Sequence, residues 1–129
     1  MVILTGFYNA DKYIIRCLTS IKEQEYKDFK CYITHDLSTD NSVNLIKEFI
    51  KDDPRFILVN DNVKKLYQAG NFDTVIRNNE DIKDDEVLIE VDGDDYLPDN
   101  QVFNRINELY KDSEVWIANG SFKYSSGAP

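Results

Sequence analysis

Short apolar runs alternate along the chain with longer segments in which apolar residues lie three or four positions apart. The runs are rich in Val, Ile, Leu and Phe and have the length of β-strands. Five of them are present, at residues 2–5, 31–34, 56–59, 87–91 and 115–118. Each run is nearly continuous rather than interrupted by polar residues, which is typical of strands that are covered on both faces.

The segments between or after these runs predict four helices. Their apolar residues recur at helical spacing and would form one face of each helix. They fall within residues 14–21, 45–50, 69–76 and 102–110. Residues that commonly cap helices precede three of these segments. The predicted caps are Asn9 or Asp11 for the first helix, Thr39 or Asp40 for the second, and Asp99 or Asn100 for the fourth.

The alternation of strands and helices predicts an α/β fold. Strands of this kind, joined by helical crossovers, form a mostly parallel sheet with helices on both faces. The 129 residues fit one domain, and no linker or internal repeat divides them. We therefore predict a single Rossmann-like domain over residues 1–129. Residues 125–129 are expected to be a frayed end or the point at which a longer protein is cut.

The chain is acidic, with a formal net charge of −9 and a pI near 4.5. This balance argues against nucleic acid as a partner, because nucleic-acid binding needs clustered Lys and Arg. No apolar run approaches the roughly 20 residues of a membrane span. The apolar run at the start of the chain is too short for the core of a signal peptide. We expect a soluble, cytoplasmic protein with no transmembrane segment. Cys17 and Cys31 lack metal-ligand spacing and are predicted to be buried free thiols.

Polar residues follow the predicted strands where ligands usually bind. In parallel sheets, ligands bind beyond the carboxyl ends of the strands, and these ends meet at one edge. Four such polar segments follow the first four strands, at residues 6–9, 35–40, 60–65 and 90–99. The topology therefore predicts that polar groups from distant parts of the sequence converge on one site.

The last of these segments, EVDGDDYLPD, places five carboxylates within ten positions. Carboxylates about 4 Å apart at a protein surface repel by roughly 4 kcal/mol, so the segment is either well solvated or holds a cation. Oxygen ligands of this kind suit Mg²⁺ and Mn²⁺, which use one or two carboxylates and complete their coordination with water and phosphate. Asp92 and Asp94 are the candidate ligands, and Gly93 between them permits close approach of a ligand to the backbone.

Four strings, taken in order, resemble a known family. They are FYNADKYIIRCLTSI, HDLSTDNS, DPRFILV and EVDGDDYLPD. Their combination over residues 2–120 resembles the part of family-2 glycosyltransferases that binds a nucleoside-diphosphate sugar, which has the GT-A fold. The resemblance implies metal-dependent binding of a sugar donor, with UDP as the expected nucleotide. It further implies inverting transfer of the sugar to a hydroxyl acceptor such as a glycan.

The same resemblance implies roles for individual residues. Gly6, Phe7 and Tyr8 would line the base pocket, with the Tyr8 ring stacking on the base. Asp36 would accept a hydrogen bond from a base N–H group.

Further residues would act on the rest of the donor. Lys65 or its neighbour Lys64 would reach the base or the phosphates. Asp92 would bond to the ribose hydroxyls and, with Asp94, take part in the DxD motif that binds the metal.

Two departures from the family pattern concern the segment after the second strand. The family commonly reads DDGSTD there, whereas this chain reads HDLSTD. His35 therefore either changes the base preference or lies exposed, and Leu37 replaces a glycine. These changes affect the identity of the nucleotide more than the presence of the site.

The catalytic base is not assigned. Inverting members use a carboxylate well beyond the DxD motif, and this chain ends at Pro129, about where an acceptor-binding part would begin. The domain therefore reads as a donor-binding part that precedes the acceptor part. Two alternatives stay open, a non-catalytic nucleotide-binding module and a metal-dependent phosphohydrolase.

Overall fold

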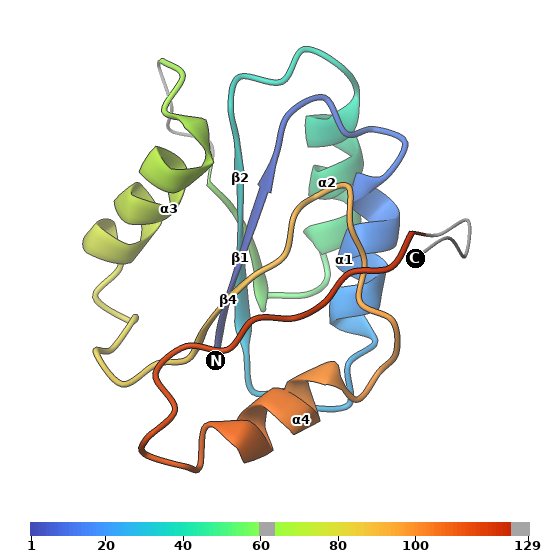
Figure 1. Ribbon diagram of the computed structural model, residues 1–129. Coiled ribbons are helices and arrows are strands. Elements are labelled where there is room, and N and C mark those ends of the chain that lie inside the picture. Colours follow the sequence, from blue (N-terminus) through green and yellow to red (C-terminus); the bar gives the residue numbers. More distant parts are fainter. Residues whose placement is uncertain (60–63, 125–129) are drawn as a thin grey trace.

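The computed structural model describes residues 1–59 and 64–124, and within these ranges it has a four-stranded parallel sheet (Figure 1). The strands are β1 (Val2–Phe7), β2 (Lys30–His35), β3 (Phe56–Val59) and β4 (Leu88–Glu90). Their order in the sheet is β3-β2-β1-β4, and every pair is parallel. The predicted single α/β domain with a parallel sheet is therefore confirmed.

Helices cover both faces of the sheet, as predicted. They are α1 (Ile14–Lys22), α2 (Ser42–Ile50), α3 (Tyr67–Asn78) and α4 (Val102–Leu109). In Figure 1, α1 and α2 lie on one side of the sheet and α3 on the other, while α4 lies toward the amino ends of the strands. Each predicted helical segment coincides with one of these helices.

The core has two layers because successive strand residues point to opposite faces. On the α1 and α2 side, Ile3 of β1 is buried with apolar residues of these helices and with Phe103 of α4. On the α3 side, Val2 and Leu4 of β1 pack with Phe72 and Val75. Both sides of β1 are thus buried, and this accounts for its continuous apolar sequence.

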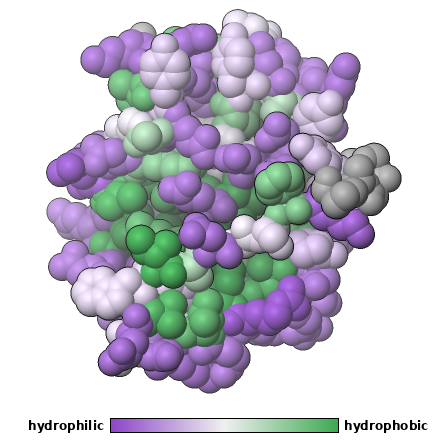
Figure 2. Space-filling view, in the orientation of Figure 1, coloured by the Kyte–Doolittle hydropathy of each residue, from purple (hydrophilic) through white to green (hydrophobic). Residues whose placement is uncertain are grey.

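The predicted fifth strand, at residues 115–118, is wrong. These residues have no regular secondary structure, and Trp116 and Ile117 are 87% and 81% exposed. A strand needs a neighbour to which its backbone can bond, and within the described ranges no backbone hydrogen bond joins this segment to a strand. Figure 2 shows hydrophobic residues gathered on the face that β4 and the chain after α4 cross in Figure 1.

The predicted cap of the first helix is also wrong. The residue that precedes α1 is Tyr13, and no side chain caps the helix. The Ile14 amide instead donates to the Ala10 carbonyl at 2.8 Å, so a backbone turn starts the helix. The side chain of Asn9 accepts a hydrogen bond from Thr39 N–H at 2.8 Å and is used to join two loops.

The other predicted caps lie close to the observed helix starts. Asp40 accepts a hydrogen bond from the amide of Ser42, the first residue of α2, at 3.1 Å. Asp99 accepts one from the amide of Gln101, which precedes α4, at 2.8 Å. Each carboxylate thus binds backbone at a helix start, although the helix begins one or two residues later than predicted.

Three further expectations concern the rest of the chain. Cys17 and Cys31 are buried and unbridged, as predicted. Within the described ranges, no helix combines the length and apolar character needed to cross a membrane. The expected frayed end at residues 125–129 and the polar residues 60–63 after β3 lie outside the described residues.

Candidate functional site

A cavity of about 370 Å³ lies at the carboxyl edge of the sheet. Its lining comes from the ends of β1 and β2, the start of α3 and the acidic loop after β4. The lining residues are Gly6, Phe7, Tyr8, Asn9, Ala10, Tyr13, Asp36, Tyr67, Gln68, Asn71, Asp92 and Asp94. The structure therefore brings together all of the predicted site residues except Lys65 in one cavity wall.

The acidic loop is held against β1 by backbone hydrogen bonds. Val91 N–H donates to the Leu4 carbonyl at 3.0 Å, and Gly93 N–H donates to the Gly6 carbonyl at 2.9 Å. These bonds extend the parallel pairing of β1 and β4 beyond the last residue of β4. A Cβ atom at Gly93 would lie only 2.7 Å from the Cβ of Phe7, so only glycine fits there without a shift of the backbone.

Two carboxylates of this loop, those of Asp92 and Asp94, are not neutralised by basic side chains, whereas Asp99 pairs with Arg105 at 3.0 Å. Asp92 and Asp94 are exposed, and neither forms an ion pair with any described residue. The side-chain amide of Gln68 donates to Asp92 Oδ1 at 2.6 Å. Partial burial and the negative charges of Asp94 and Asp92 raise the pKa of Asp95 above its ordinary value. The loop therefore carries negative charge that a bound cation would stabilise.

This donor set fits a hard divalent cation that is shared with a phosphate ligand. The described residues contain no group of three or more His, Cys, Asp or Glu side chains arranged around a metal position. A cage made by the protein alone is therefore not formed within them. Mg²⁺ and Mn²⁺ commonly bind through one or two carboxylates together with water and substrate phosphates, and Asp92 and Asp94 offer that number.

Asp36 joins the end of β2 to the start of α3. Its Oδ1 accepts hydrogen bonds from the Leu66 amide at 2.9 Å and from the Asn71 side chain at 3.4 Å. Its Oδ2 accepts one from the Tyr67 amide at 3.0 Å. A carboxylate has about four acceptor positions, so Oδ2 retains a position for a ligand N–H group.

The residues after β1 lie in two different environments. Tyr8 is 53% exposed at the cavity, and the ammonium group of Lys65 lies 4.5 Å from the centre of its ring. Phe7 is buried, and its ring stacks on the ring of His35 at 5.4 Å between centroids. Tyr8 can therefore meet a ligand ring, whereas Phe7 forms the floor beneath the cavity.

The expectation that His35 lies exposed is wrong. Its side chain is buried against Phe7, and its Nδ1 accepts a hydrogen bond from the Ser38 amide at 3.1 Å. His35 therefore shapes the loop after β2 from within. Leu37 in this loop has φ of 60°, a left-handed conformation that favours glycine. The observed conformation at this position therefore suits the glycine of the family pattern, although the residue here is leucine.

Among the exposed lining residues, the sequence did not indicate Tyr13, Tyr67 and Gln68. All three are exposed at the cavity. Tyr67 and Gln68 begin α3, which follows residues of no recognisable motif, and Tyr13 lies just before α1. The only available signal is that α3 starts after β3, on the edge where ligands bind.

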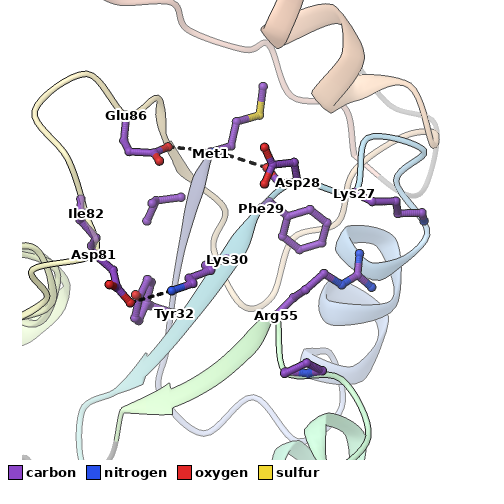
Figure 3. A pocket seen from close by; sticks show the side chains of 12 residues that line it. Met1, Lys27, Asp28, Phe29, Lys30, Tyr32, Arg55, Asp81, Ile82 and Glu86 are labelled. Atoms are coloured by element: carbon purple, nitrogen blue, oxygen red, sulfur yellow. Dashed lines mark hydrogen bonds and ion pairs between the residues drawn. The ribbon is translucent and has the colours of Figure 1, made fainter.

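A second cavity, of about 310 Å³, lies at the amino edge of the sheet (Figure 3). Lys30 there pairs with Asp81 at 2.8 Å, and the amino group of Met1 pairs with Glu86 at 2.9 Å. Arg55 pairs with Asp53 at 2.6 Å. These charged groups bind one another, so the carboxyl edge is the stronger candidate for an ionic ligand.

Comparison with protein families identifies the family of the chain. Residues 2–127 match the model of the family described as glycosyl transferase family 2. The chain belongs to this family. The predicted family membership is therefore confirmed.

Two similar proteins are described as a transferase and a polymerase. The dTDP-rhamnosyl transferase RfbG of Shigella flexneri is 32% identical over 122 residues, which are 93% of this chain and 42% of that protein. A teichoic acid poly(glycerol phosphate) polymerase of Staphylococcus epidermidis is 45% identical over 65 residues, which are 48% of this chain and 9% of that protein. The chain thus spans less than half the length of these relatives.

Solved structures share the fold of the chain. The mannosyltransferase PcManGT of Pyrobaculum calidifontis, in complex with GDP-Man and Mn²⁺, superposes with a TM-score of 0.76 at 19% identity. The match covers 88% of this chain and 33% of that one. The TarS 1-349 structure from S. aureus, in complex with UDP-GlcNAc, has a TM-score of 0.72 at 19% identity, covering 85% of this chain and 30% of that one. These matches confirm the predicted GT-A type fold.

Proposed function

We propose that the cavity at the carboxyl edge binds a nucleoside-diphosphate sugar together with Mn²⁺ or Mg²⁺, and that the chain is the donor-binding part of a glycosyltransferase. The observation that carries the proposal is the convergence of Asp36, Tyr8 and the Asp92–Asp94 pair on one cavity from three strand ends. Family membership supports sugar transfer as the reaction, and the paired charges of the other cavity favour this site over it.

The base and the ribose would bind at the β1 and β2 side of the cavity. Tyr8 offers an exposed ring on which a base can stack, and Lys65 lies over that ring. The free position on Asp36 Oδ2 would accept a base N–H group, as uracil, thymine and guanine each provide. Gly6 and Phe7 form the wall and floor, and Asp92 would accept hydrogen bonds from the ribose hydroxyls.

The diphosphate would lie at the acidic loop. Asp92 and Asp94 would hold the divalent cation. Gly93, which lies between them in the sequence, packs tightly on β1 and so fixes the distance of both carboxylates from that strand. When bound, the cation supplies positive charge that stabilises the departing diphosphate. The carboxylates do not contact the phosphates themselves, since like charges repel.

The proposed transfer is inverting and goes to a hydroxyl group of an acceptor such as a glycan. It needs a carboxylate base beside the acceptor hydroxyl. We assign that role to none of the described residues. The chain therefore binds the donor in this proposal, and the acceptor site belongs to the remainder of the transferase.

The nucleotide is proposed to be UDP. The nucleotide differs among similar proteins. They include a dTDP-rhamnosyl transferase and structures bound to UDP-GlcNAc and to GDP-Man. The test is therefore calorimetric titration with UDP, GDP and dTDP, each with Mn²⁺ and with EDTA. We expect UDP to bind more tightly in Mn²⁺ than in EDTA, and more tightly than GDP.

Asp94→Ala is the decisive variant, and Asp84→Ala is its control. Asp84 is an exposed carboxylate between α3 and β4, away from the cavity lining. We expect Asp94→Ala to remove the effect of Mn²⁺ and Asp84→Ala to retain it. Equal affinity in Mn²⁺ and EDTA for the unmodified chain contradicts the proposal. Hydrolysis of simple phosphate esters without nucleotide preference would instead favour a phosphohydrolase.

A further inference from the structure

We infer that Gln68 is a positioning residue for Asp92. Its neutral side-chain amide holds one oxygen of that carboxylate and leaves the negative charge available to a divalent cation. The inference rests on the proposed function and extends it to α3, which carries no residue of the DxD motif.

The contact is one short hydrogen bond between the side chains of Gln68 and Asp92. Gln68 Nε2 donates to Asp92 Oδ1 at 2.6 Å. Within the described part of the chain, no other side chain donates to the Asp92 carboxylate. Since a carboxylate has about four acceptor positions, this bond fixes the orientation of the group while Oδ2 stays open to a ligand.

Gln68 is held in place from two sides. Asp36 binds the amides of Leu66 and Tyr67, so the first turn of α3 begins at the cavity wall. The stem of Gln68 lies against Gly6, where an added Cβ would be 3.2 Å from its Cγ. The Gly6 carbonyl in turn binds Gly93 N–H, next to Asp92. The amide and the carboxylate are thus both positioned by the end of β1.

The neutrality of the amide is the feature that suits a metal site. At the amino edge, Asp81 is held by Lys30, whose ammonium group lowers the pKa of that carboxyl and cancels its charge. A basic residue in place of Gln68 would do the same to Asp92. A neutral donor orients the carboxylate without competing with the cation, as outer partners of metal ligands do.

The test is Gln68→Met, which keeps the length of the stem against Gly6 and removes only the amide. We expect the affinity for Mn²⁺, measured by electron paramagnetic resonance of free Mn²⁺ with UDP present, to fall about tenfold. The thermal unfolding midpoint should stay unchanged, because Gln68 is exposed and methionine keeps the contact of the stem with Gly6.

Gln68→Lys is a second variant, and Gln101→Met is the control. The lysine retains a donor but adds a charge, so we expect Mn²⁺ affinity to fall at least as far as in Gln68→Met. Gln101 also lies at a helix start, that of α4, and is absent from the cavity lining, so its replacement should leave Mn²⁺ affinity unchanged.

The outcomes separate this inference from the proposed function. If the unmodified chain binds Mn²⁺ in an Asp94-dependent way and Gln68→Met does so within twofold, the role of Gln68 is overturned and the proposed function stands. A matching drop in the unfolding midpoint would also overturn it, because the role would then be structural. If the unmodified chain binds no Mn²⁺, both proposals fail together.

Discussion

The amino and carboxyl edges of the sheet differ in the pairing of their charged side chains and in their backbone conformations. At the amino edge, charged groups form ion pairs, such as Lys30 with Asp81 and Arg55 with Asp53. At the carboxyl edge, Asp92 and Asp94 form none with the described residues. Ion pairs satisfy charge within the protein, whereas unpaired carboxylates leave it for a ligand. The contrast therefore separates an end whose charges are paired within the protein from an end whose carboxylates are proposed to bind a ligand.

Residues with strained backbone conformations also lie at the carboxyl edge. Within the described ranges, three residues other than glycine have positive φ, namely Asn9, Leu37 and Tyr67. All three lie in loops or helix starts at the carboxyl edge. Strained backbone of this kind is concentrated at binding sites, where the surrounding contacts hold it. Four substitutions test this contrast, in order of decreasing expected effect.

The largest effect is expected from Gly93→Ala at the carboxyl edge. The new Cβ would lie 2.7 Å from Phe7 Cβ and 3.1 Å from the Gly6 carbonyl oxygen, and neither can rotate away. We expect the free energy of unfolding to fall by about 3 kcal/mol, measured by urea denaturation, and nucleotide binding to be lost. Gly120→Ala, which meets nothing within 4 Å, is the control and should change stability by less than about 0.5 kcal/mol.

Asp53→Ala tests the amino edge. Asp53 is buried and accepts hydrogen bonds from Arg55 Nε at 2.9 Å and Nη2 at 2.6 Å. Its removal leaves a partly buried guanidinium without its partner, so we expect a loss of about 2 kcal/mol at pH 7. Calorimetric unfolding measures it. The contrast between the two edges also requires that this variant bind nucleotide and Mn²⁺ normally at a temperature where it is folded.

The same pair predicts a pH dependence with a definite sign. The hydrogen bond from Arg55 holds the pKa of Asp53 below its usual value. Its stabilising effect is therefore complete above the unfolded pKa of about 3.9 and is lost as the pH falls through the lower, folded pKa. The stability difference between the unmodified chain and Asp53→Ala should be constant from pH 7 to 5 and shrink below about pH 4. A difference that grows on acidification would contradict this account.

Leu37→Gly tests the strain at the carboxyl edge. Leu37 adopts φ of 60° and is 37% exposed, so glycine relieves the backbone while little apolar contact is lost. We expect a gain of about 1 kcal/mol in the free energy of unfolding. Urea denaturation measures it, with Leu109→Gly, an exposed leucine at the end of α4, as the opposite case that should destabilise. A loss of stability in Leu37→Gly would show that the leucine side chain outweighs the strain.

The smallest effect is expected from Lys65→Ala. The ammonium group lies 4.5 Å from the centre of the Tyr8 ring, and such contacts contribute about 0.5–1 kcal/mol at exposed sites. We expect UDP affinity to fall roughly two- to fivefold in a calorimetric titration. Lys64→Ala, at the neighbouring exposed position, should leave the affinity unchanged. If both variants behave alike, Lys65 acts through general charge rather than through Tyr8.

Much of the fold was predictable because it depends on local periodicity. Helical spacing of apolar residues located all four helices, and continuous apolar runs located all four strands. The run at residues 115–118 was misassigned, since strand formation also requires a neighbouring strand. Helix starts were less accurate, because side chains such as Asn9 serve contacts between loops that a sequence does not display.

The candidate site was predictable where it followed strand ends. Gly6, Tyr8, Asp36, Asp92 and Asp94 line one cavity because the parallel topology brings those ends to one edge. The burial of His35 on Phe7 was not predictable, since it depends on how two adjacent strand ends pack side by side. The ligand roles of the five lining residues named above stay predictions until they are tested by titration.

The sequence by itself determined the alternating elements, the parallel sheet and the concentration of carboxylates after β4, because these depend on composition and short-range spacing. Only the tertiary structure decided which groups those carboxylates meet. Gln68 lies 24 positions before Asp92, and Lys30 lies 51 positions before Asp81. Whether a carboxylate faces a neutral amide or an ammonium group depends on such distant contacts, and that difference distinguishes the proposed binding edge from the edge with paired charges.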